Sequence, residues 1–129
     1  MNEGQIGRSN VLQIAVIDDG IDAGMLLHPE RLVKDMVVDT YQNVVRERMP
    51  EDSFLTMHGT ICARIMELYG ASAELVSVCI FDQEDLKTNC SRLAAALLWC
   101  MEMQIPLIHM SVGTRLFEDY DQVRDIIAG

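Results

Sequence analysis

Three short segments of the sequence carry side chains that could do acid–base or peptide-binding chemistry. The segment Asp18-Asp19-Gly20 offers two carboxylates, which can orient a histidine, bind Mg²⁺ or accept a proton. His58 is followed by Gly-Thr, and imidazole is the usual general base near neutral pH. In Ser111-Val112-Gly113-Thr114, the glycine would let an extended peptide lie alongside and pair with main-chain groups. Taken alone, each segment also fits a structural role: a turn, a loop histidine or the end of a strand.

The elements that must position these segments can be predicted from the hydrophobic pattern. Apolar runs typical of strands alternate with amphipathic stretches typical of helices, which predicts an α/β fold. We expect strands over residues 11–17, 32–39, 43–46, 74–81 and 105–111, and helices over 58–69, 91–104 and 117–127. The expected arrangement is three-layer, a mostly parallel sheet with helices on both faces, in one domain over residues 1–129. Since the carboxyl ends of parallel strands meet at one edge, three strand ends would come together there: Asp18-Asp19-Gly20, Phe81-Asp82 and Ser111-Val112-Gly113-Thr114. His58 would join them if it opens the helix that begins there.

The two central helices have periodic apolar residues, which is typical of a buried face. The expected stripe on helix 58–69 consists of Ile61, Cys62, Ile65, Met66 and Leu68. The expected stripe on helix 91–104 consists of Leu93, Ala96, Leu97 and Cys100. Asn89 or Ser91 would cap the second of these helices.

The composition is that of one folded domain with a strongly acidic balance. Half of the 129 residues are apolar, and twenty acidic against ten basic residues give a formal net charge of −10. Such a charge repels phosphate backbones and anionic lipid headgroups, so we expect no nucleic-acid and no membrane partner, whereas a basic peptide or protein would fit. No stretch resembles a signal peptide or a membrane span, which predicts a cytoplasmic protein. The four cysteines lack motif spacings such as Cys-x-x-Cys, so we expect buried, reduced thiols, no metal site and no cofactor.

Read in register, the chain resembles the N-terminal half of a subtilisin-like (S8 family) serine peptidase. The run Ile-Ala-Val-Ile-Asp-Asp-Gly-Ile-Asp over 14–22, with His28-Pro29-Glu30 downstream, resembles the strand that carries the triad aspartate. The block His58-Gly59-Thr60 resembles the one that carries the triad histidine at a helix start. The stretch from 73 to 113 resembles the strand, helix and strand that lead to the substrate-binding wall.

This resemblance implies roles for five residues. Asp18 would orient and stabilise the imidazole of His58, which would accept the proton of a serine hydroxyl. Ser111, Val112 and Gly113 would form the strand that pairs with the peptide substrate on the amino side of the cleaved bond.

The resemblance also implies that the nucleophile is missing from this sequence. The family's serine and its oxyanion-hole asparagine lie beyond the matched blocks, and the sixteen residues after Gly113 contain no serine. The chain further departs from the family at Ile61, where a second histidine is usual, at Arg64 in place of glycine, and at His109 in place of asparagine. Loss of a triad nucleophile costs on the order of 10⁶ in kcat, so we expect this truncated domain to be inactive alone.

Three interpretations follow, from different functional classes. The chain could be a subunit of a split peptidase, acting in the processing of a peptide precursor, with its serine supplied by a second chain. It could instead be a non-catalytic pseudopeptidase that binds a peptide or protein, and in either case we expect association with a second chain or a homo-oligomer. The third interpretation is a receiver-type signalling domain with Asp82 as phosphoacceptor, but no lysine follows Lys87 to contact the phosphoryl group.

Overall fold

The computed structural model describes residues 11–39, 41–54, 56–69, 72–81 and 88–110. The strands are β1 (Gln13–Asp18), β2 (Leu32–Val38), β3 (Val45–Glu47), β4 (Glu74–Cys79) and β5 (Leu107–Met110). The helices are α2 (His58–Tyr69) and α3 (Cys90–Glu102), and two 3-10 turns, η1 (Ala23–Met25) and η2 (Pro29–Arg31), lie between β1 and β2. Each predicted element that falls on described residues is present within a few residues of its expected bounds, whereas the predicted helix over 117–127 lies outside them.

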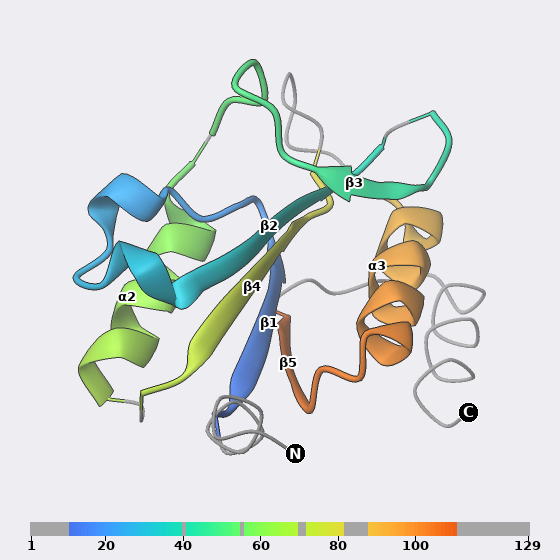
Figure 1. The fold of residues 1–129 in the computed structure, drawn as a ribbon. Helices are drawn as coiled ribbons and strands as arrows, with labels where there is room; N and C mark the ends of the chain where they lie inside the picture. The colour runs from blue at the N-terminus through green and yellow to red at the C-terminus, as the bar shows by residue number, and fades with distance from the viewer. Residues whose placement is uncertain (1–10, 40, 55, 70–71, 82–87, 111–129) are drawn as a thin grey trace.

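One mixed sheet organises the described part of the chain (Figure 1). Its five strands lie in the order β3-β2-β4-β1-β5. β1 pairs in parallel with β4 and β5, β2 pairs in parallel with β4, and only β3 runs antiparallel. The prediction of an α/β fold with a mostly parallel sheet is therefore confirmed.

Strand β1 lies inside the sheet, between β4 and β5, and its residues are apolar on both faces. Ala15 and Ile17 belong to a large apolar cluster that includes Leu97 of α3. Val16 points the other way and belongs to a smaller cluster that includes Ala63 of α2. The two helices thus pack against opposite faces of the sheet, as Figure 1 also shows.

Helix α3 buries its apolar face as its sequence predicts. The Asn89 side chain caps it by accepting a hydrogen bond from the N–H of Arg92 at 2.9 Å. Ala96, Leu97 and Cys100 are all buried in the large cluster. Burial raises the pKa of the Cys100 thiol to about 11, so this cysteine stays protonated inside the protein.

Helix α2 differs in part from its prediction. Ile61, Ile65 and Leu68 are 53%, 50% and 59% exposed, so the prediction of burial is wrong for these three. Cys62 and Met66, the other two residues of the predicted stripe, are half-buried, and Met66 packs against the smaller cluster. The buried residues of α2 are small instead: Gly59, Thr60 and Ala63. At the start of α2 the reason is distance, because a Cβ on Gly59 would already meet the carbonyl oxygen of Gly20 in the loop after β1.

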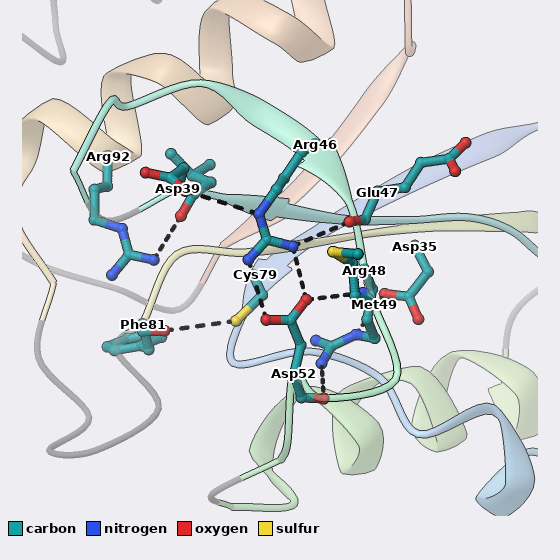
Figure 2. Close-up of polar contacts among 11 residues, drawn as sticks. Asp35, Asp39, Arg46, Glu47, Arg48, Met49, Asp52, Cys79, Phe81 and Arg92 are labelled. Carbon is teal, nitrogen blue, oxygen red and sulfur yellow. Dashed lines mark hydrogen bonds and ion pairs between the residues drawn. The ribbon is translucent and has the colours of Figure 1, made fainter.

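The polar stretch after β3 is irregular and is held in place by ion pairs (Figure 2). Arg46 contacts both carboxylate oxygens of Asp52, at 2.7 and 3.1 Å. Arg48 donates to the Asp35 carboxylate at 3.0 Å and to the backbone carbonyl of Asp52 at 2.9 Å. These contacts fix the chain between the sheet and the start of α2.

Within the ranges given above, none of the helices combines the length and the apolar character that crossing a bilayer requires.

Candidate functional site

Asp18 and His58 are in direct contact. Asp18 is the last residue of β1 and is buried, whereas His58 is the first residue of α2 and its side chain is 57% exposed. The imidazole Nδ1 lies 2.6 Å from Oδ2 of Asp18. The other carboxylate oxygen of Asp18 accepts the N–H of Asp19 at 2.8 Å, which fixes the carboxylate plane. A carboxylate bound to Nδ1 places the proton there and leaves Nε2 as the basic nitrogen.

Asp19 holds the start of α2 against the end of β1. One of its carboxylate oxygens accepts the Gly59 N–H at 2.8 Å, and the other accepts the Thr56 hydroxyl. The same hydroxyl oxygen accepts the His58 N–H at 3.3 Å. Burial raises the pKa of the Asp19 carboxyl, and the Gly59 hydrogen bond opposes that shift.

Two glycines allow this close approach. A Cβ on Gly59 would lie 2.4 Å from the carbonyl oxygen of Gly20, a distance that real Cβ atoms do not reach. Gly20 itself has φ of 104°, a left-handed conformation that favours glycine. The side chains of Arg48 and Phe54 fill the space beside it, so the ordered stretch after β3 also borders the site.

The remainder of α2 is fastened to the segment between β1 and β2. The buried Thr60 hydroxyl accepts the Asp22 N–H at 2.9 Å. Glu67 accepts the N–H groups of Leu27 and His28, at 2.9 and 2.8 Å. Arg64, the large cation noted in the sequence, is accommodated at the surface, where it donates to the Met25 carbonyl at 2.9 Å.

The site lies where the sheet topology favours ligand binding. β1 and β4 are neighbours, but the connection after β1 lies on the face covered by α2, whereas the connection after β4 contains α3 on the other face. The carboxyl ends of two such strands form the switch point at which ligands bind in open α/β sheets. Asp18 and its partner in register, Cys79, end these two strands.

Cys62 is a third reactive side chain at the site. It follows His58 by four residues on α2, and one ligand atom from each of Asp18, His58 and Cys62 lies within 4.8 Å of the other two. Burial raises the pKa of the Cys62 thiol, and the charges of Asp18 and Asp19 raise it further. Nucleophilic cysteines depend on the opposite shift, so the surroundings do not favour a thiolate nucleophile.

The predicted site residues therefore divide into two groups. The structure brings Asp18 and His58 together, as the sequence predicts, while their catalytic role remains a prediction. Ser111, Val112 and Gly113, which follow β5 in the sequence, lie outside the described residues. Asp82 lies outside them too. Sequence reasoning missed Thr56 and Cys62; the spacing of four between His58 and Cys62 was a signal for the second, and nothing marked the first.

No protein-family model and no curated protein matches this chain. The geometry alone defines the class: an α/β protein with a carboxylate–imidazole pair at the end of an inner strand of its sheet.

Proposed function

We propose that this chain is the aspartate- and histidine-bearing part of a subtilisin-like serine peptidase. The observation that carries the proposal is the Asp18–His58 contact of 2.6 Å, with the imidazole exposed on its other side. In this proposal a second chain supplies the nucleophilic serine. In this proposal the sheet is the middle of a three-layer, subtilisin-like domain, and the protein acts in the cytoplasm on a peptide or protein substrate.

In the proposed reaction, the partner's serine oxygen attacks the scissile carbonyl while Nε2 of His58 accepts its proton. Asp18 stabilises the imidazolium that results. The imidazolium then gives this proton to the leaving amine as the peptide bond breaks, which yields an acyl-serine. Water then attacks the acyl-serine while Nε2 of His58 accepts its proton. The imidazolium returns this proton to the serine oxygen as the acid is released.

The outer side of α2 supports the need for a second chain. His58, Ile61, Ile65 and Leu68 follow one another at intervals of three or four residues, so they lie along one side of the helix. We call the last three the exposed α2 stripe. A partner that covers this stripe would desolvate three large apolar side chains and reach the imidazole along the same line.

A fluorophosphonate probe, which labels only an activated serine, tests the proposal. The chain would be purified alone and after co-expression with candidate partner chains that carry a Gly-Thr-Ser block. We expect no labelling of the isolated chain and labelling of the partner serine in the complex. His58→Ala should abolish that labelling, whereas His28→Ala, at an exposed histidine beside Glu67 toward the other end of α2, should leave it unchanged.

The same complex tests the docking side. Ile65→Lys should weaken association at least about tenfold, since a charge would be buried at the interface. Leu98→Lys, at a comparably exposed leucine of α3, should leave association unchanged. Serine labelling that ignores the loss of His58 would overturn the split-peptidase proposal.

A second candidate function is peptide binding without catalysis. Among the described strands, β5 stands at an edge of the sheet and pairs only with β1, so its outer backbone groups could pair with an extended peptide. The predicted peptide-facing residues Ser111, Val112 and Gly113 continue from this strand. An unstructured peptide that binds the wild-type chain, binds His58→Ala equally well and binds Gly113→Val poorly would favour this function over the first.

A further inference from the structure

The cluster of Asp18, His58 and Cys62 has the composition of a metal site. The carboxylate, imidazole and thiol atoms lie within 4.8 Å of one another. Around a tetrahedral zinc ion with bonds of about 2.0–2.3 Å, neighbouring ligand atoms are about 3.3–3.7 Å apart. Nδ1 of His58 and Oδ2 of Asp18 are 2.6 Å apart, closer than this, so the two side chains would move apart around an ion, while the thiol lies within 4.8 Å of a ligand atom of each.

The types of ligand discriminate between metals. Mg²⁺ and Ca²⁺ are held by oxygen atoms, whereas one sulfur, one nitrogen and one oxygen suit a borderline ion such as Zn²⁺. His58 and Cys62 are separated by one helical turn, so a rigid element presents both ligands on the same side.

The surroundings favour a cation. The Asp19 carboxylate lies beside the cluster, close enough to interact electrostatically with both Asp18 and Cys62. The Asp19 N–H holds one oxygen of Asp18, which aims the second oxygen at the imidazole. Since His58 is 57% exposed, an ion can enter from solvent, and a water molecule can complete its coordination.

We propose that Asp18, His58 and Cys62 bind one Zn²⁺ ion, with a fourth position open to water. On binding, Cys62 loses its proton to solvent and coordinates as thiolate, while the imidazole coordinates in its neutral form. The four cysteines lack motif spacings, which predicted no metal site, but His58 and Cys62 are four residues apart on one helix. This inference does not depend on the peptidase proposal; if both hold, zinc occupies the imidazole and inhibits its acid–base role.

Titration of the purified, reduced chain with Zn²⁺ and with Co²⁺ tests the inference. Calorimetry should show one Zn²⁺ per chain, and Co²⁺ should give a thiolate-to-cobalt charge-transfer band. Cys62→Ser and Cys62→Ala should abolish the band and weaken Zn²⁺ binding at least about tenfold. Cys90→Ser, at a half-buried cysteine in α3, should change neither, and Mg²⁺ should not compete.

The fold of each variant is checked by its far-ultraviolet circular dichroism and urea midpoint, and two substitutions at Cys62 guard against one that fails to fold. A wild-type chain without the cobalt band would overturn the inference. So would a band that persists without Cys62, or Zn²⁺ binding that is equal in wild type and both Cys62 variants. A loss of zinc binding in His58→Gln supports it further.

Discussion

Helix α2 has twelve residues and helix α3 has thirteen, and the two helices pack against opposite faces of the same sheet. Helix α3 buries Leu97 and Cys100 in the large cluster and is capped by Asn89, although Leu98 on its other side is exposed. Helix α2 turns small residues inward, leaves Ile61, Ile65 and Leu68 exposed, and begins with His58. The two helices therefore have different roles. Helix α3 contributes mainly to the core, whereas α2 makes a close, polar contact with the end of β1 and buries fewer large side chains.

The largest expected difference between the helices is in stability. Leu97→Ala should lower the free energy of unfolding by about 3 kcal/mol, because Leu97 is 2% exposed and its removal leaves a cavity in the large cluster. The same substitution at Leu68, which is 59% exposed, should change it by less than about 0.5 kcal/mol. Urea unfolding of both variants checks this. Equal losses would contradict the contrast between the helices.

The close contact of α2 can be disturbed without removing any group. Gly59→Ala should cost about 2 kcal/mol of unfolding free energy, because the added Cβ would meet the Gly20 carbonyl oxygen at 2.4 Å. Gly24→Ala is the matched control, since its Cβ would meet nothing closer than 3.4 Å. Thermal unfolding measures the difference in stability. The imidazole NMR signals of His58 should shift in the first variant alone.

The start of α3 depends on one neutral cap. Asn89→Ala should cost about 1 kcal/mol, because the N–H of Arg92 loses its acceptor. Ser91→Ala, two residues later in the chain, should have an unfolding free energy within about 0.5 kcal/mol of wild type. Chemical unfolding distinguishes the two variants. A larger loss of unfolding free energy in Ser91→Ala would show that Ser91, not Asn89, is the cap.

The start of α2, unlike that of α3, should respond to pH. The folded-state pKa of Asp19 is raised above its ordinary value of 3.8, so the folded protein holds this proton more tightly than the unfolded chain does. Its contribution to stability is therefore complete below pH 3.8 and is lost as the pH rises through the folded pKa. Unfolding free energies of wild type and Asp19→Asn, measured from acid to neutral pH, should show this relative loss.

Asp39 provides a control of opposite sign. Hydrogen bonds from the N–H groups of Gln42 and Tyr41 lower the pKa of this exposed carboxyl. Wild type should therefore gain stability relative to Asp39→Asn as the pH rises through the interval below 3.8. If the two variants shift in the same direction, the shift at Asp19 is not the cause of the first result.

The strands could be predicted from the sequence because they depend on local pattern, and simple topology placed Asp18 and His58 near one edge of the sheet. Their direct contact was expected only from the resemblance to subtilisin-like peptidases. The apolar run before Asp18 indicates a strand buried on both faces, and parallel strands bring their carboxyl ends to one edge. The cap at Asn89 was likewise one of two expected alternatives.

The inner face of α2 could not be predicted, because hydrophobic periodicity does not report how closely two backbones approach. At the start of α2, the close approach of Gly59 to Gly20 leaves no room for a large side chain, while Ile61, Ile65 and Leu68 face outward. The ion pairs of Arg46 and Arg48 with acidic residues depend on tertiary positions, which a polar, proline-containing stretch does not encode locally.

The position of β1 between β4 and β5 has a consequence for how the chain folds. Both of its neighbours come from later in the sequence: Gln13 pairs with Glu74, 61 residues on, and Ile14 pairs with Leu107. During synthesis, β1 is therefore exposed to other chains until β4 has left the ribosome, and its second edge until β5 follows. Such distant pairing predicts slow folding, limited by closure of long loops, and a need for protection of the nascent strand from aggregation.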